Sequence, residues 1–234
     1  MKLPVYLDYN ATTSVAPEVA DAIMPFLREQ FGNPSSSHVY GQRAMQAVAE
    51  ARRQGATPGE IVFTGSATEA NNLALFSVAG AGQEHGLRPG TGCVPLIVGL
   101  GVAARLAGEN PSRAQAHLRH MRELLHALLQ ASVPDLRLNG HSSERLPNTL
   151  NVSFLSASGR ELLQDAAADV VASVGSACHA DSQAVSGVLA ALGVNPSVAA
   201  EAVRLSVGVP TTKDEIEHAA AALAGAWLRH TRKE

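Results

Sequence analysis

Short apolar segments alternate with amphipathic helical segments along this chain, and the alternation limits its fold more than any other feature of the sequence. Runs rich in valine, isoleucine and leucine have the length of strands at 60–64, 136–138, 149–154, 170–174 and 203–207. Apolar residues with helical spacing lie at 16–32, 44–53, 67–76, 112–131 and 213–229. This order of elements predicts a fold of the α/β or α+β class.

The composition is that of a folded protein with a sizeable core. Of the 234 residues, 46% are hydrophobic and 17% are charged, which argues against disorder and predicts one or two domains. No apolar run has the length of a bilayer-spanning helix and no signal peptide is recognised, so we expect a cytoplasmic protein without a membrane partner. The formal charge of −3 lacks the basic surplus that nucleic-acid binding requires.

The two cysteines, Cys93 and Cys178, are too few for a disulfide framework or an all-cysteine metal site. Cys178 directly follows an apolar strand in the small-residue run GSAC, which suits an accessible nucleophile. A buried structural cysteine is the alternative. His179 cannot easily point the same way as Cys178, so we expect no Cys/His pair, and Cys93 is interpreted as structural.

Arg204 stands among apolar residues in the strand-like segment AVRLSVG. A guanidinium in such a place needs an anion. The carboxylate of a substrate and the carboxylate of an acidic side chain in the same protein would serve equally well. The sequence leaves both alternatives open. His38 and His85 lie in polar loops. We interpret them as exposed loop residues in preference to catalytic ones, and they stay candidates only.

Two glycine-containing turns could hold a phosphate group. The segment 60–76 predicts a strand, a turn and a helix whose first N–H groups, with the Thr68 hydroxyl, could bind an anion; from spacing alone, ordinary capping is favoured. The segment Gly99-x-Gly101-x-x-Ala104 superficially matches a dinucleotide fingerprint, but the acidic residue at the expected distance falls inside a helix. We therefore expect a small-residue helix that packs closely on a neighbour.

Seven motifs in order identify a family: YLDYNATT, FGNPSSSH, EIVFTGSATEANNLAL, GQEHGLRPGT, RLPNTLNVSF, GSACHAD and AVRLSVG. Together they resemble the cysteine desulfurases of the class V aminotransferase fold, a group that also contains selenocysteine lyases. The resemblance implies a homodimer that uses pyridoxal phosphate to remove sulfur from L-cysteine, or selenium from L-selenocysteine. The products are L-alanine and a chalcogen atom carried on an enzyme cysteine. A sulfur-acceptor protein or iron–sulfur scaffold would take the sulfur.

The resemblance also assigns roles to individual residues. Cys178 matches the sulfur-carrying cysteine, and Arg204 matches the arginine that binds the substrate carboxylate. Ala67 and Thr68 match the helix start that holds the cofactor phosphate, which reverses the preference for simple capping there. Thr91 matches a residue that reaches the neighbouring subunit's phosphate. Asn33 is a weaker candidate for the substrate pocket.

The chain departs from this family in its middle. The family has a long central region between the NNLAL helix and the GQERGLRPGT-type loop, and this region carries the Schiff-base lysine. Here NNLALFSV runs almost directly into GAGQEHG, and the chain has three lysines, Lys2, Lys213 and Lys233, none in a comparable setting. We therefore expect the remnant of a fold-type I pyridoxal-phosphate enzyme with a truncated large domain, exposed apolar faces and little or no activity.

The expected remnant has three parts. Residues 1–79 would form the N-terminal segment and the start of the large domain, 80–108 a dimer and cofactor loop with a connecting helix, and 109–234 a small α+β domain carrying the cysteine loop. Selenocysteine lyase is an alternative ancestral activity, with cysteine favoured as the substrate. A non-catalytic protein that binds a full-length subunit or a sulfur acceptor is the other alternative.

Overall fold

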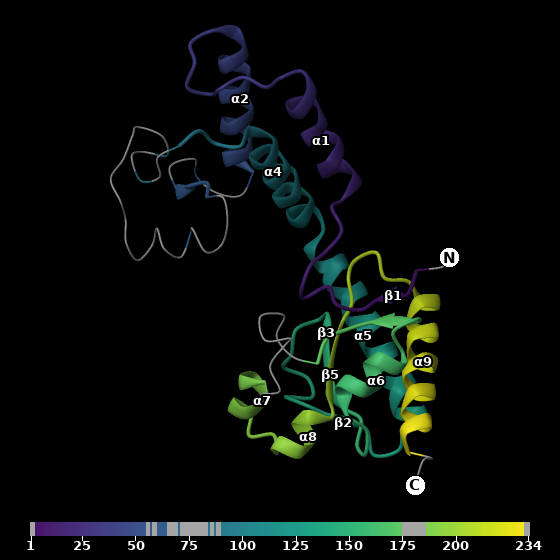
Figure 1. The fold of residues 1–234 in the computed structure, drawn as a ribbon. Helices are drawn as coiled ribbons and strands as arrows, with labels where there is room; N and C mark the ends of the chain where they lie inside the picture. The colour runs from purple at the N-terminus through teal and green to yellow at the C-terminus, as the bar shows by residue number, and fades with distance from the viewer. Residues whose placement is uncertain are drawn as a thin grey trace. The chain divides into compact units, whose positions relative to one another are not determined.

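A computed structural model describes the chain at residues 3–54, 57, 60–64, 70, 84, 87, 90–174 and 186–231 (Figure 1). The chain forms two compact units, which are described separately. One unit joins Met1–Thr13 to Ser112–Glu234, and the other is Ser14–Pro111. The three-part division expected from the sequence stays a prediction.

The first unit is built on a three-stranded antiparallel sheet. Its strands lie in the order β2 (Arg137–Leu138), β3 (Thr149–Ser153) and β5 (Ala202–Ser206). A short parallel pair, β1 (Val5–Tyr6) and β4 (Val170–Val171), lies beside it. The bridges Asp8↔Ser206 and Ser173↔Arg204 connect this pair to β5. The strands expected at 149–154 and 203–207 are confirmed to within one residue, because each alternates apolar and polar side chains.

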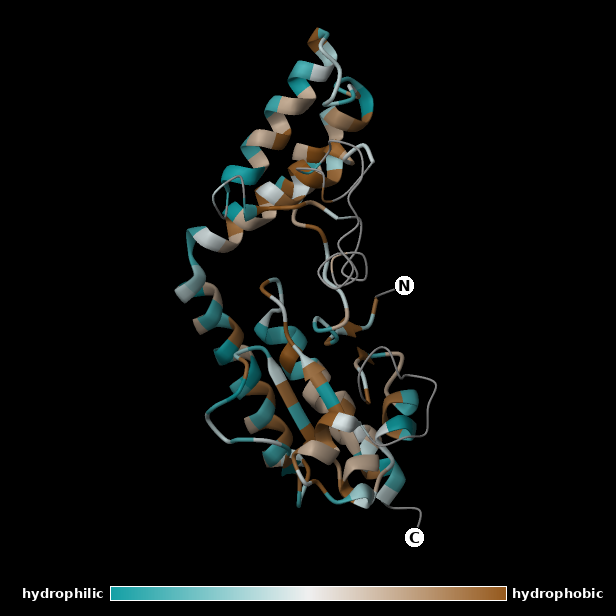
Figure 2. Cartoon of the chain, turned by 90° about the vertical axis from the view of Figure 1, so that its left-hand side faces the viewer, coloured by the Kyte–Doolittle hydropathy of each residue, from teal (hydrophilic) through white to brown (hydrophobic). Residues whose placement is uncertain are grey.

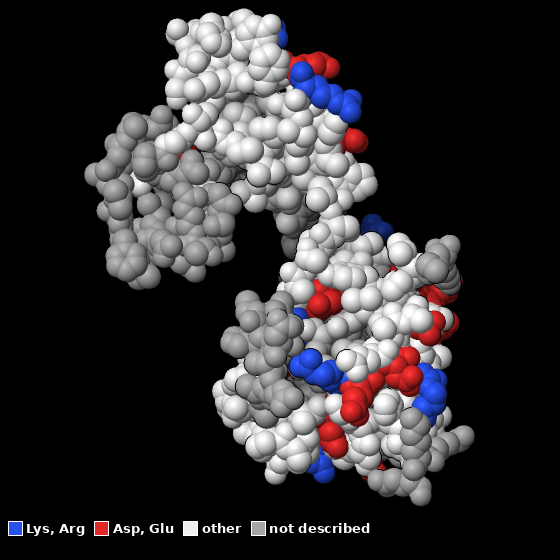
Figure 3. All heavy atoms as spheres, in the orientation of Figure 1, with Lys and Arg blue, Asp and Glu red and all other residues white. Residues whose placement is uncertain are grey.

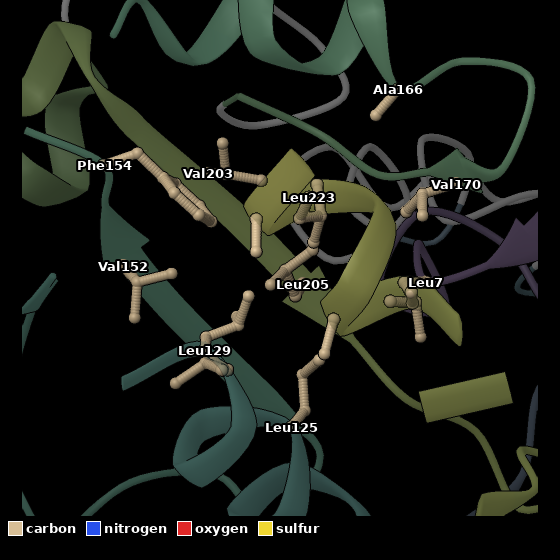
Figure 4. Packing of buried hydrophobic residues seen from close by; sticks show 14 of the residues in the cluster. Leu7, Leu125, Leu129, Val152, Phe154, Ala166, Val170, Val203, Leu205 and Leu223 are labelled. Atoms are coloured by element: carbon tan, nitrogen blue, oxygen red, sulfur yellow. The ribbon is translucent and has the colours of Figure 1, made fainter. Parts of the chain in front are cut away.

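Helices cover the apolar face of this sheet. They are α5 (Pro111–Ser132), α6 (Gly159–Asp165) and α9 (Lys213–Thr231). Two short helices, α7 (Gly187–Ala191) and α8 (Pro196–Ala200), form a separate small cluster with Ala202 of β5 through Leu189 and Ala199. Leucines 125 and 129 of α5 and Leu223 of α9 pack against Val203 and Leu205 of β5 in one buried cluster (Figure 4). The alternation of hydropathy along the strands is visible in Figure 2. One face of the sheet is therefore a core and the other is polar.

The second unit consists, in its described residues, of three packed helices. These are α1 (Pro17–Arg28), α2 (Val39–Arg53) and α4 (Val94–Glu109). The glycines of α4 allow the close packing that the sequence predicts. A Cβ atom at Gly101 would lie 2.8 Å from both Cα and Cβ of Ala51, and one at Gly99 would lie 2.7 Å from Cδ1 of Ile23. The close-packing interpretation of this stretch is confirmed.

The prediction of a strand at 60–64 is wrong. Residues 61–64 are described and belong to no strand. The amide N–H of Phe63 donates instead to the Glu84 carboxylate at 2.8 Å, and Arg52 binds both that carboxylate and the Ile61 carbonyl. A strand needs a paired neighbour for its backbone groups, and a β-branched segment without one takes side-chain partners.

The second unit exposes large apolar side chains. On α4, Leu96 is 65% exposed and Leu100 is 58% exposed, and Phe31 after α1 is 72% exposed. In the view of Figure 3 its surface carries few charged side chains. The exposed apolar faces expected from the sequence are present. None of the helices in the described ranges is long and apolar enough to cross a membrane.

Candidate functional site

Arg204 lies on the polar face of the sheet and is ion-paired. Its Nη2 donates to Oδ1 of Asp8 at 3.0 Å, and the two side chains are 18% and 16% exposed. The Nε atom of Arg204 is buried and has no hydrogen-bond partner among the described residues. The internal ion pair that the sequence left open is therefore present. It leaves one buried donor of the guanidinium for another acceptor.

The N-terminal motif LDYNATT supplies Asp8 and is fixed along β5. The Ser206 N–H donates to the Leu7 carbonyl at 2.8 Å, and the Asn10 N–H donates to the Ser206 hydroxyl oxygen at 2.9 Å. Asp8 and Arg204 are 196 residues apart in the sequence. Asp8 is not among the site residues predicted from the sequence, although its place in the first family motif was a signal for it.

The polar face of the sheet continues beyond Arg204. Because opposed residues of an antiparallel pair share a face, Asn151 lies beside Arg204, and Thr149 beside Ser206. The Asn10 side chain donates to the Thr149 hydroxyl oxygen at 2.8 Å. The face thus combines the Arg204 guanidinium, the Asp8 carboxylate and several neutral polar groups, and Arg137 of β2 opposes Ser153 on the same face. Such a set can bind a small charged molecule with defined orientation.

The Tyr9 ring packs closely on Gly208, which follows β5. A Cβ atom at Gly208 would lie 2.4 Å from the Tyr9 ring, so only glycine allows this approach. Burial raises the pKa of Tyr9, the charges of Glu215 and Tyr6 add to the rise, and a hydrogen bond with Thr211 opposes it. Tyr9 is therefore a neutral phenol at ordinary pH.

Two other predicted site residues meet in the second unit. Asn33 and Thr91 line one pocket of about 280 Å³, together with Phe26, Gly92 and Cys93. The Asn33 carboxamide accepts the Ser35 N–H at 2.9 Å, which fixes a local turn. Cys93 precedes α4 and is an exposed free thiol. His38 is exposed and caps α2.

Several predicted residues lie outside the described residues: Ala67, Thr68, His85, Cys178 and His179. Their roles stay predictions. Within the described ranges, no group of three or more His, Cys, Asp or Glu side chains could hold a metal ion.

A cluster of arginines and a glutamate that was not predicted from the sequence joins α5 to the segment before β3. Arg122 donates to the Leu146 carbonyl and pairs with Glu123, and Arg145 also pairs with Glu123 at 3.0 Å. Burial alone would raise the pKa of Glu123, but the hydrogen bonds and charges of the two arginines outweigh it and lower the pKa. Burial lowers the pKa of His126, and Arg145 lowers it further.

The described residues do not fit the covalent attachment of pyridoxal phosphate. Lys213 is the one lysine among them; its Nζ lies 3.3 Å from a Glu217 carboxylate oxygen and its side chain is 65% exposed. A Schiff base needs an amine held beside the cofactor, and an exposed amine engaged by a carboxylate of its own helix is not in such a setting. Lys2 and Lys233 lie outside the described residues.

The family is shown by a match along most of the sequence. A family model described as "Aminotransferase class-V" matches residues 5–88 and 77–218. The chain belongs to the class-V aminotransferase family. Members of its cysteine desulfurase branch depend on pyridoxal phosphate, and this chain is of the cysteine desulfurase lineage.

Curated relatives and solved structures agree with this placement. The chain is 28% identical to "Cysteine desulfurase IscS" of Colwellia psychrerythraea over 384 positions, covering 99% of this chain and 94% of the relative. It is 27% identical to the protein of the same name from Methylococcus capsulatus over 369 positions, covering 94% and 91%. A structure named "NifS-like protein" has a TM-score of 0.85 at 21% identity, covering 95% of this chain and 99% of that one. It shows the same fold.

The class-V relatives are longer in the middle. An alignment of 384 positions exceeds the 234 residues of this chain, so the surplus positions face no residue here. The family model also matches in two stretches that overlap at 77–88. This is the place where the sequence runs from NNLALFSV into GAGQEHG, so the missing region lies inside the chain.

Proposed function

We propose that this chain is an internally shortened cysteine desulfurase that keeps the carboxylate anchor but does not desulfurate L-cysteine by itself. The observation that carries the proposal is the setting of Lys213, which is exposed and paired with Glu217. Lys2 and Lys233 match no lysine-bearing motif of the family. Without a suitable lysine the chain cannot bind the cofactor covalently, so no step of a reaction is assigned to it here.

The parts that remain support binding of an amino acid. Arg204 is oriented by Asp8, and its buried Nε donor has no partner in the part of the chain that the structure describes, which suits a carboxylate group. Cys178 is the proposed sulfur carrier on the strength of its GSAC motif. Because the named relatives are cysteine desulfurases, we favour L-cysteine over L-selenocysteine as the amino acid.

A second candidate function is binding to another protein without turnover. It is favoured by the exposed leucines 96 and 100 on one side of α4, since exposed apolar patches mark interaction sites. The partner would be a full-length desulfurase subunit or a sulfur-acceptor protein.

An absorbance spectrum tests the primary proposal. The purified chain is incubated with pyridoxal phosphate, freed of excess cofactor and recorded before and after addition of L-cysteine, and alanine is assayed in parallel. We expect a colourless protein and no alanine. A retained yellow band that shifts with L-cysteine and disappears in Lys213→Ala, or in the same change at Lys2 or Lys233, would contradict it. For the second candidate, a full-length desulfurase should co-elute with the chain and not with Leu96→Glu.

A further inference from the structure

Asn151 and Arg204 are direct neighbours on the polar face of the sheet. They are paired in the register of β3 and β5. Opposed residues in an antiparallel pair place their Cβ atoms about 4.5–5.5 Å apart on the same side. The carboxamide and the guanidinium therefore border the same space above the sheet.

A chain of hydrogen bonds fixes the direction of the Asn151 carboxamide. The Ser153 hydroxyl donates to the Val198 carbonyl at 2.7 Å. The Asn139 amide donates one hydrogen to Ser153 Oγ at 2.9 Å and the other to Asn151 Oδ1 at 2.8 Å. Asn139 follows β2, on the side of β3 opposite to β5. The Asn151 oxygen is thus held toward β2, so its NH₂ group, on the other branch of the same planar carboxamide, is not taken up by this bond to Asn139.

The site around Arg204 needs an acceptor and cannot easily take another cation. Asp8 binds one Nη and neutralises much of the guanidinium charge, while Nε is a buried donor that no described residue accepts from. A neutral amide donor beside it strengthens binding of an anion without adding repulsion between like charges. Two donors from adjacent strands match the two oxygens of a carboxylate.

We propose that Asn151 is a second carboxylate-binding residue, which donates from Nδ2 to the α-carboxylate of the amino acid held by Arg204. Asn139 is then a positioning residue that acts through Asn151. This inference rests on the proposed function, because Arg204 must be the carboxylate anchor. No bond is made or broken in the step.

The test compares two ligands that differ only in the carboxylate. L-alanine and L-alaninamide are titrated into the purified full chain, with binding followed by NMR. In Asn151→Asp the oxygen that accepts from Asn139 is kept and the donor is replaced by a charge that repels a carboxylate. We expect at least about tenfold weaker binding of L-alanine and no weakening of L-alaninamide, a net cation that the added carboxylate attracts. Asn151→Ala should weaken L-alanine about fivefold.

Controls separate a local effect from a general one. Asn195→Asp adds the same charge at the cap of α8, where a carboxylate accepts the same hydrogen bonds from Ser197, and it should change neither affinity. Asn139→Ala should lower the preference for L-alanine over L-alaninamide by less than Asn151→Asp does. Circular dichroism and the fluorescence of Trp227, the single tryptophan, confirm folding.

The outcomes distinguish the two proposals. If Arg204→Gln abolishes the preference for L-alanine while both Asn151 variants retain it, the role of Asn151 is overturned and the anchor role of Arg204 stands. If Arg204→Gln changes nothing, or the unaltered chain does not prefer L-alanine to L-alaninamide, both proposals are overturned. Loss of the preference in both Asn151 variants and Arg204→Gln, with Asn195→Asp unchanged, supports the inference.

Discussion

The two units of this chain differ in what holds them together. The unit of residues 3–13 and 112–231 buries apolar residues from a sheet and from helices on it, including Phe154, Leu205 and Leu223. The described part of the unit 14–111 has a core cluster of three buried residues, Ala51, Phe63 and Ile97, and contains no strand. The first unit therefore has the larger apolar core, whereas the described helices of the second unit pack around a small one.

Core truncation should show the largest difference between the units. Leu205→Ala should lower the free energy of unfolding by about 2–5 kcal/mol, because its buried side chain is surrounded by other core residues. Denaturant unfolding is followed by the fluorescence of Trp227, which lies in the same unit as Leu205. Leu96→Ala is the control on the exposed face of α4 and should leave this transition unchanged. An equal loss in both variants would refute the comparison.

Breaking the Asp8–Arg204 pair should have the next largest effect. Removing one partner of a fully buried pair costs about 3–5 kcal/mol, and we expect about 1–3 kcal/mol for Asp8→Asn because both side chains retain some contact with water. The measurement is again the Trp227 transition. Glu217→Gln, which breaks the exposed pair with Lys213, should leave stability nearly unchanged. If the two changes cost the same, Asp8 does not fix the N-terminal segment to the sheet.

A glycine substitution tests the packing of the second unit. Gly101→Ala places a methyl group against the backbone of Ala51, so we expect a loss of about 1–3 kcal/mol as α2 and α4 separate. Gly108→Ala, in the same helix with nothing within 4 Å of the added atom, should gain about 0.5–1 kcal/mol. Far-UV circular dichroism measures both. If Gly101→Ala also shifts the Trp227 transition, the two units do not unfold independently.

The smallest effect should be a pH dependence of the first unit. Burial lowers the pKa of His126 in the folded chain below its usual 6.5. Between these two pKa values the unfolded chain binds more protons than the folded one, so stability falls as pH drops from above 6.5 toward the folded pKa. The Trp227 midpoint in denaturant should therefore be lower at pH 5.5 than at pH 8. His126→Gln should reduce this difference, and an unchanged difference would assign it to other groups.

Much of the fold follows from local patterns. The alternation in TLNVSF and AVRLSV predicts β3 and β5, and the helices at 112–131 and 213–229 were expected within two residues of their observed ends. The small residues of α4 predicted its close packing. The strand prediction at 60–64 also rested on a local pattern and is wrong. The β-branched segment has the composition of a strand, but residues 61–64 pair with no neighbouring strand.

The candidate site was predictable only in part. Arg204, Asn33 and Thr91 were named from motifs, and the structure brings Asn33 and Thr91 to one pocket. The sequence could not choose between a carboxylate ligand and an internal partner for Arg204. That choice depended on Asp8, whose contact spans nearly the whole chain.

By itself, the sequence determined the lineage, the scarcity of lysine and the position of the missing region, because motifs and residue counts are properties of the chain alone. It also determined the strands and helices whose apolar residues follow the strand period or the helix period alone. Only the tertiary structure decided that the N-terminal motif joins the C-terminal unit and that Asp8 pairs with Arg204. It also placed Asn151 beside Arg204 in the register of β3 and β5. These contacts depend on which backbone groups meet across long separations, and no local pattern encodes that meeting.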